Sequence, residues 1–227
     1  MLDSGFYNMD CMTGMNEFPD KFFDLAIVDP PYGEQVRRGG YTSGRVTRGV
    51  NAATNGRKYH GSLWQMKRPD EAYFRELERV SKNQIIWGGN YFADLLAPSS
   101  CWVAWDKENG TNDFADFELA YTSFKGGCRI FRFLWNGMLQ GDMKNKENRI
   151  HPTQKPVALY SWLLSKFSEP GQKILDTHVG SASSLIACHR NRNPFWGFEI
   201  DPEYYKQAKE RLEDELAQMT VFDFLGV

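Results

Sequence analysis

Apolar and polar positions alternate along the chain in blocks that have the lengths of strands and helices. Residues 70–80 and 157–167 repeat their apolar positions at helical spacing, and a third helix is expected with Asp201 as N-cap and Pro202 in its first turn. Short apolar runs with β-branched or aromatic residues have strand length. Strands that alternate with helices predict a doubly wound, largely parallel α/β sheet. The expected strands are residues 24–28, 84–88, 101–105, 118–123, 173–175 and 195–198.

Ligands of such sheets bind beyond the carboxyl ends of the strands, so we looked for chemistry directly after each apolar run. Asp29-Pro30-Pro31-Tyr32 follows the run 24–28. Two prolines end a strand abruptly because each fixes φ and lacks an N–H. We expect the Asp29 carboxylate and the Pro30 carbonyl to accept both N–H groups of an exocyclic amine, and the Tyr32 ring to stack on a flipped base. A plain Pro-Pro turn with an Asp cap is the alternative.

A second pattern reads as strand, small-residue turn and helix over residues 174–187. Gly180 allows a close approach of the backbone to a ligand, and the following helix N-terminus supplies free N–H donors. Glu199 ends the next apolar run, where an acid can accept ribose hydroxyls. Tight strand–helix packing or a nicotinamide dinucleotide site would give the same pattern. The presence of Asp-Pro-Pro-Tyr in the same small domain favours a nucleoside sulfonium cofactor.

Positive charge is concentrated in residues 33–68, which contain eight basic residues and one acid in a chain of net charge −2. This segment also holds seven glycines and follows no sustained period, as functional loops do. We expect it to face a polyanion, with a solvated loop that has no partner as the alternative, and the resemblance described below implies that this polyanion is DNA. The expected DNA-binding residues are Arg37, Arg38, Arg45, Arg48, Arg57 and Lys58.

Membrane, secretory and metal-binding signals are missing from the sequence. No apolar run has the length of a membrane span, and no basic region precedes an apolar stretch near residue 1. The four cysteines form no CxxC pair, so we expect reduced thiols, no metal site and a cytoplasmic protein.

Taken together, these motifs resemble those of the β-class DNA amino-methyltransferases, which methylate N6 of adenine or N4 of cytosine. The most specific match is the segment 151–156, His-Pro-Thr-Gln-Lys-Pro, and the segments 6–12 and 118–121 are also similar. The resemblance implies S-adenosylmethionine as cofactor and Asp29, Pro30, Pro31 and Tyr32 as the catalytic residues. It further implies cofactor binding by Asp10, Cys11, His151, Thr153, Gln154, Lys155, Asp176, His178, Gly180, Ser181, Ser183 and Glu199.

The resemblance covers most of the chain and implies a single methyltransferase domain, 1–227, with a Rossmann-like sheet. Its motif order is circularly permuted, with the catalytic motif first and the cofactor turn last. The segment 125–150 corresponds to a short target-recognition region. Asp29 at the start of the catalytic motif favours adenine in double-stranded DNA. A homodimer and a separate restriction endonuclease are left open as further partners.

The cofactor turn departs from the family pattern, which usually reads Asp-Pro-Phe followed by Gly-Ser-Gly-Thr. Here Thr177 and His178 stand for Pro and Phe, and Ala182 and Ser183 for Gly and Thr. Ala182 keeps open a non-catalytic DNA-binding protein with this fold. N4-cytosine methylation and an RNA substrate stay open as well, and a nicotinamide oxidoreductase is the remaining alternative.

Overall fold

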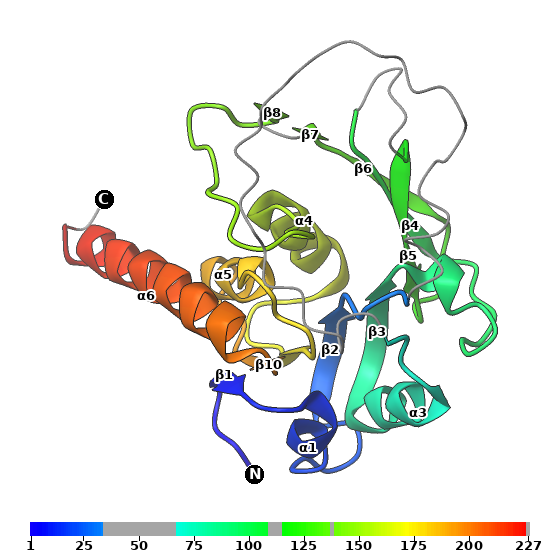
Figure 1. Cartoon of the computed structure of the whole chain (residues 1–227). Helices are drawn as coiled ribbons and strands as arrows, with labels where there is room; N and C mark the ends of the chain where they lie inside the picture. The colour runs from blue at the N-terminus through cyan, green and yellow to red at the C-terminus, as the bar shows by residue number, and fades with distance from the viewer. Residues whose placement is uncertain (34–66, 109–114, 137–138, 226–227) are drawn as a thin grey trace.

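The computed structural model describes residues 1–33, 67–108, 115–136 and 139–225, with side chains as far as residue 218. Its main sheet has eight strands in the order β1-β10-β9-β2-β3-β5-β4-β6 (Figure 1). Neighbouring strands are parallel except at β5, which is antiparallel to both β3 and β4. The bounds are β1 (Gly5–Asn8), β2 (Phe23–Val28), β3 (Ser81–Trp87), β4 (Trp102–Asp106), β5 (Phe117–Thr122), β6 (Arg129–Arg132), β9 (Ile174–Asp176) and β10 (Phe195–Glu199). A separate hairpin joins β7 (Trp135–Asn136) to β8 (Leu139–Gln140).

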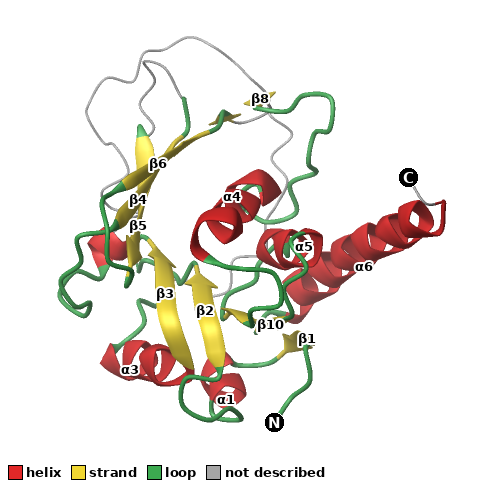
Figure 2. Ribbon diagram, turned by 180° about the vertical axis from the view of Figure 1, so that it is seen from behind, coloured by secondary structure: helices red, strands yellow, loops and turns green. Residues whose placement is uncertain are grey.

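Helices cover both faces of this sheet, as expected for a doubly wound fold (Figure 2). On one face α1 (Cys11–Met15) and α3 (Glu71–Val80) pack against inward side chains of β2 and β3. On the other face α4 (Val157–Phe167), α5 (Ser183–Arg190) and α6 (Pro202–Leu225) form the larger core. Strand β2 contributes to both cores in alternation, so both of its faces are buried.

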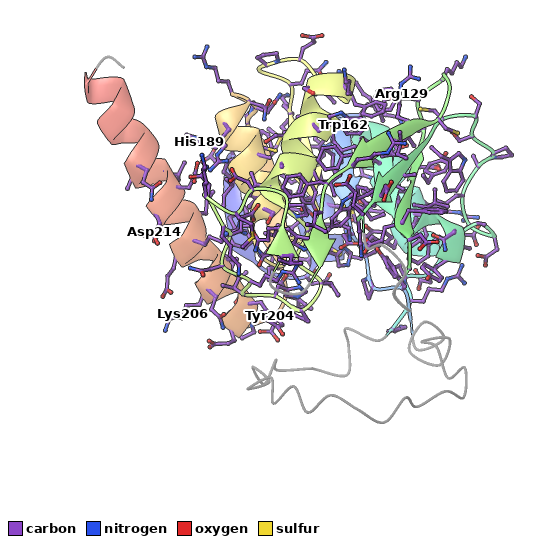
Figure 3. All side chains as sticks on the ribbon, turned by 90° about the horizontal axis from the view of Figure 1, so that it is seen from above. Arg129, Trp162, His189, Tyr204, Lys206 and Asp214 are labelled. Atoms are coloured by element: carbon purple, nitrogen blue, oxygen red, sulfur yellow. The ribbon has the colours of Figure 1, made fainter. Side chains whose placement is uncertain are left out.

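The helix boundaries expected from the sequence are confirmed. Helix α4 spans the predicted residues, and α3 begins after Asp70, whose carboxylate accepts the N–H of Tyr73 at 3.3 Å. Asp201 caps α6 by accepting the N–H groups of Glu203 and Tyr204 at 2.9 and 3.1 Å. In Figure 3, Tyr204 lies at the start of α6 beside the body of the molecule, whereas Lys206 and Asp214 lie on its outer side.

Strands β1 and β6 were not predicted, because each has only four residues and little burial to mark it. Strand β1 nevertheless positions the site. It pairs in parallel with β10, with Asn8 opposite Glu199, and so brings Asp10 to the edge where β10 and β9 end. The carboxyl ends of β1, β10, β9, β2 and β3 therefore share one edge of the sheet. Within the described residues, no helix combines the length and hydropathy needed to cross a membrane.

Candidate active site

The Asp-Pro-Pro-Tyr motif lies directly after β2, as predicted. The hydroxyl of Tyr32 donates to Asp29 Oδ1 at 2.7 Å, so the first and last residues of the motif are held together. The ammonium of Lys155 contacts Asp29 Oδ2 from the segment that precedes α4. Each carboxylate oxygen thus has one donor and keeps a second lone pair for another hydrogen bond.

The Tyr32 ring is enclosed by residues that follow β3. Tyr91 stacks on it with a centroid distance of 5.0 Å and an interplanar angle of 21°, and Phe92 meets it edge-on at 6.1 Å. Gly88 has φ +67°, and a Cβ added there would lie 2.2 Å from Tyr32 Cε1. The turn after β3 therefore needs glycine to admit the ring. Sequence reasoning missed Gly88 and Tyr91, although the Gly-Gly pair ending an apolar run was a signal.

Lys155 also links Asp29 to β5 and β4. Its Nζ lies 3.2 Å from Glu118 Oε2, and the other oxygen of Glu118 contacts the Lys107 ammonium. These two cations lower the pKa of Glu118 to about 2 despite its burial, which acts in the opposite direction. Carboxylates and ammonium groups therefore alternate in the order Asp29, Lys155, Glu118, Lys107.

The predicted cofactor turn lies at the end of β9, the neighbour of β2 in the sheet. Asp176 accepts the Ser184 hydroxyl at 2.5 Å and the His178 N–H at 2.9 Å. Gly180 has φ +57° and donates its N–H to Glu199 Oε2 at 2.9 Å, which joins the ends of β9 and β10. The backbone freedom expected of Gly180 is thus used in this turn.

Two buried carboxylates in this half of the site lack a cationic partner among the residues that the structure describes. Burial raises the pKa of Asp176 to about 7 and also raises the pKa of Glu199. The groups that contact them are hydroxyls and backbone N–H groups. Uncompensated negative charge at this edge favours a cationic ligand.

The smaller residues of the turn are held by their neighbours. Ser181 and Ser183 lie 3.1 Å apart through their hydroxyls. His178 contacts the Thr177 hydroxyl at 2.9 Å and packs edge-on against Tyr73 at 5.5 Å. Burial lowers the pKa of His178 to about 4, so the ring is neutral near pH 7 and presents an aromatic surface, as the phenylalanine of the family pattern would.

The residues near the N-terminus reach the same edge. The Asp10 side chain caps α1 through the Thr13 N–H at 3.0 Å and is exposed. The thiol of Cys11 is half-buried, and its burial raises the pKa to about 12, so it stays protonated. All four cysteines are free thiols, as expected. In the described part of the chain, no group of three or more His, Cys, Asp or Glu side chains could hold a metal ion.

The segment 151–155 bridges the two halves of the site. His151 lies beside Gly180, packs against Tyr204 at 4.4 Å and contacts the Thr153 hydroxyl at 3.1 Å. Gln154 is buried, and its amide bonds the backbone of Ile150 and Asn148. Lys155 then points to the catalytic motif. His151, Gln154 and Lys155 therefore contact three different parts of the structure, whereas the resemblance implies that all three bind the cofactor.

Ala182 adopts a left-handed conformation with φ +63°, which explains why this position usually holds glycine. Its side chain is fully buried in the core cluster with Leu185. The added methyl group therefore packs into the core.

Sequence reasoning also missed Arg211 on α6. Its guanidinium donates to the Ser181 carbonyl at 2.6 Å and the Ser183 hydroxyl at 2.9 Å, and it pairs with Glu147 at 2.6 Å. The second Glu147 oxygen accepts the Val157 N–H at the start of α4. This chain of bonds connects the turn 176–184 to the segment 125–150. No local motif could have revealed it, because the partners are far apart in sequence.

The DNA-binding residues expected between 37 and 58 lie outside the described residues. The ends of their segment are described: Gly33 lies beside Arg68, which pairs with Asp94 and lies 5.6 Å from the centre of the Phe92 ring. The basic segment therefore leaves and rejoins the fold next to Tyr32 and its aromatic neighbours.

Comparison with known proteins agrees with this geometry. The sequence model of a family described as DNA methylase matches residues 104–210. The type II methyltransferase M.HpaI of Haemophilus parainfluenzae is 44% identical over 72 residues, which are 31% of this chain and 23% of that protein. The methylase YubD of Escherichia coli is 25% identical over 92% of this chain and 90% of its own length.

The fold matches that of a solved structure, the M1.HpyAVI–SAM complex. The TM-score is 0.53 with 18% identity, over 91% of this chain and 98% of the other. The sequence is therefore similar to DNA methylases over residues 104–210, just under half of the chain, and its fold is similar to that of the M1.HpyAVI–SAM complex.

Proposed function

We propose that this protein transfers a methyl group from S-adenosylmethionine to N6 of adenine in double-stranded DNA. The observation that carries this proposal is the juxtaposition of Asp29-Pro30-Pro31-Tyr32 with the turn 176–184 at the ends of the paired strands β2 and β9. An amino-group site and a nucleoside site lie side by side there, at the edge where doubly wound sheets bind their ligands.

S-adenosylmethionine fits the charge of the second site. The cofactor carries a sulfonium and an ammonium group, and the buried carboxylates of Asp176 and Glu199 have raised pKa values and no cationic partner among the described residues. A nicotinamide dinucleotide would bring a pyrophosphate next to two acids, which is electrostatically unfavourable. Asp176, Gly180 and Glu199 would therefore hold S-adenosylmethionine, which supplies an electrophilic methyl group when bound.

The chain's own residues position and activate the amine. Asp29 accepts one amino N–H through its remaining lone pair, and the Pro30 carbonyl accepts the other. These bonds draw the nitrogen lone pair out of conjugation with the base ring, toward the methyl group. Tyr32 keeps the flipped base flat against its ring. Preorganised acceptors of this kind supply most of the catalytic effect, because they need no rearrangement during the reaction.

The base is tested by incubating the protein with labelled S-adenosylmethionine and duplex DNA that lacks methylated bases, followed by digestion to nucleosides. We expect label in N6-methyl-2′-deoxyadenosine, because the motif opens with Asp29. Label in N4-methyl-2′-deoxycytidine would keep the mechanism and refute adenine as the base. An RNA duplex in a parallel reaction is expected to take up no label.

Cofactor affinity is expected to depend on pH through Asp176. Because the pKa of Asp176 is about 7 in the free protein, binding a cationic cofactor below that pH requires loss of a proton. The dissociation constant for S-adenosylmethionine should therefore rise about tenfold per pH unit below 7 and level off above it. His151 and His178, with pKa values of about 4, do not titrate in this window. Calorimetry from pH 5.5 to 8.5 measures this dissociation constant. In Asp176→Asn the dissociation constant should no longer change with pH below 7.

Glu199→Ala is expected to weaken cofactor binding by about tenfold or more, since it removes the acceptor for a ribose hydroxyl and the bond to Gly180. Glu203→Ala, an exposed acid four residues later, is the matched control. Unchanged affinity in Glu199→Ala by calorimetry would remove Glu199 from the cofactor site.

Residues 33–68 would hold the DNA backbone in this scheme, since the segment is anchored at Gly33 and Arg68 beside the base site. The segment 125–150 would contribute to target recognition, and its bond through Glu147 to Arg211 connects it to the cofactor turn.

A further inference from the structure

We propose that Lys155 is a positioning residue for the catalytic carboxylate of Asp29 and does not bind the cofactor. This inference rests on the proposed function, because it assigns Asp29 to the amine of the base. It departs from the role that the resemblance implies for the polar residues of the segment 151–156.

The contacts of the Lys155 ammonium are directed to the Asp29 motif and to Glu118. The Lys155 Nζ donates to Asp29 Oδ2 and, at 3.5 Å, to the Tyr32 hydroxyl, and it forms an ion pair with Glu118 Oε2 at 3.2 Å. The side chain is only 4% exposed, and Nζ lies 5.4 Å from the centre of the Trp87 ring. Among the described residues, none of these contacts is with the turn at the end of β9.

This placement gives Lys155 a definite effect on the catalytic motif. Its bond to Oδ2 and the Tyr32 bond to Oδ1 fix the plane of the carboxylate. The two remaining lone pairs then point in fixed directions before the base arrives.

Glu118 and Lys107 complete the cluster of charged side chains around Lys155. Glu118 is ionised, with a pKa of about 2, and shares the charge of Lys155 with Asp29. Lys107 in turn neutralises Glu118, so the buried cluster of four charges is balanced. A buried lysine paired with Asp29 alone would hold that carboxylate more tightly and leave it a weaker acceptor for the amine.

Several other titratable groups face Asp29 and bear on any pH dependence of the reaction. They come from α3, α4, β9 and the loops between elements, and most are neutral at pH 7 because burial opposes their charged forms. Those that interact electrostatically with Asp29 are Tyr32, Tyr73, His151, Lys155, Tyr160, Asp176 and His178.

The test compares three variants with the wild type: Lys155→Met, Glu118→Gln and, as matched control, Lys82→Met. Lys82 is an exposed lysine that pairs with Asp24 at the opposite end of β2. Each protein is assayed for cofactor affinity by calorimetry and for methyl transfer to unmethylated duplex DNA at saturating S-adenosylmethionine. Melting curves report whether each variant folds, and Lys155→Arg tests whether a cation alone restores the rate.

We expect Lys155→Met to lower kcat about 100-fold while the dissociation constant for S-adenosylmethionine changes less than about threefold. Glu118→Gln should also lower kcat with the dissociation constant unchanged within about threefold, and Lys155→Arg should recover part of the rate. The control Lys82→Met should match the wild type in both assays.

A large loss of cofactor affinity in Lys155→Met with kcat retained would overturn the inference and return Lys155 to the cofactor site. If Lys155→Met does not fold, Glu118→Gln carries the comparison: cofactor affinity lost with kcat retained contradicts the inference. A wild-type protein that transfers no methyl group would instead refute the proposed function, while the cofactor affinity of Lys155→Met would still test the inference.

Discussion

Replacing Asp29 with alanine is expected to lower methyl transfer at least about 1000-fold and to leave S-adenosylmethionine binding within about threefold of the wild type. The carboxylate is the only acidic group of the Asp-Pro-Pro-Tyr motif, and it directly follows β2, whereas the turn that would hold the cofactor lies at the end of β9. Loss of Asp29 should not unfold the protein, because Lys155 keeps Glu118 as a partner. Labelled methyl transfer and calorimetry on the same preparation measure both quantities.

Asp24→Ala is the control for this experiment. Asp24 lies on the same strand, but its carboxylate binds Lys82 and the Lys173 N–H at the opposite end. Asp24→Ala should lower the free energy of unfolding by about 1 kcal/mol and leave the rate of methyl transfer per folded molecule unchanged. If Asp29→Ala kept normal turnover, the amine-activation mechanism would be wrong.

Gly88→Ala should have the second largest effect, about a 100-fold loss of kcat, through the position of the Tyr32 ring. Alanine at φ +67° is strained by about 1–2 kcal/mol, and its Cβ would lie 2.2 Å from Tyr32 Cε1, closer than real atoms come. The ring must therefore move, and its hydroxyl would lose the 2.7 Å bond to Asp29. Stopped-flow fluorescence of DNA carrying 2-aminopurine at the target base should show weaker stacking of the flipped base.

Gly171→Ala separates backbone strain from the effect on the ring. Gly171 also has a positive φ, +86°, but no atom lies within 4 Å of an added Cβ. We expect both variants to lose about 1 kcal/mol or more of stability, and only Gly88→Ala to lose activity. Equal losses of activity in the two variants would show that the contact between Gly88 and Tyr32 does not matter for catalysis.

Most of the fold could be predicted from the sequence because its signals are local. The apolar stripe of α3, the Asp201 cap of α6 and the apolar runs of β2, β3 and β10 all depend on neighbours within a few residues. Strand β5 was expected at residues 118–123, but its antiparallel pairing and the short strand β1 were not predicted, because both depend on pairing partners elsewhere in the chain.

In the site, too, local features could be predicted from the sequence and long-range contacts could not. The catalytic motif and the turn at Gly180 were visible because proline and glycine have distinctive backbone requirements. The partner of Lys155 was not, since Asp29 is 126 residues away and the segment 151–156 resembles a cofactor motif. The contacts of Arg211 with Ser181 and Glu147 were equally hidden, because they join three separate parts of the chain.

Expression of the protein in a bacterial host without DNA methyltransferases, followed by mass spectrometry of the genomic nucleosides, tests the central claim most directly. The wild type should place N6-methyladenine in the host DNA, and the Asp29→Ala twin should place none. Sequencing that reads modified bases would then give the target sequence. Host DNA free of methylated adenine and cytosine, from cells in which the folded protein is abundant, would contradict the account.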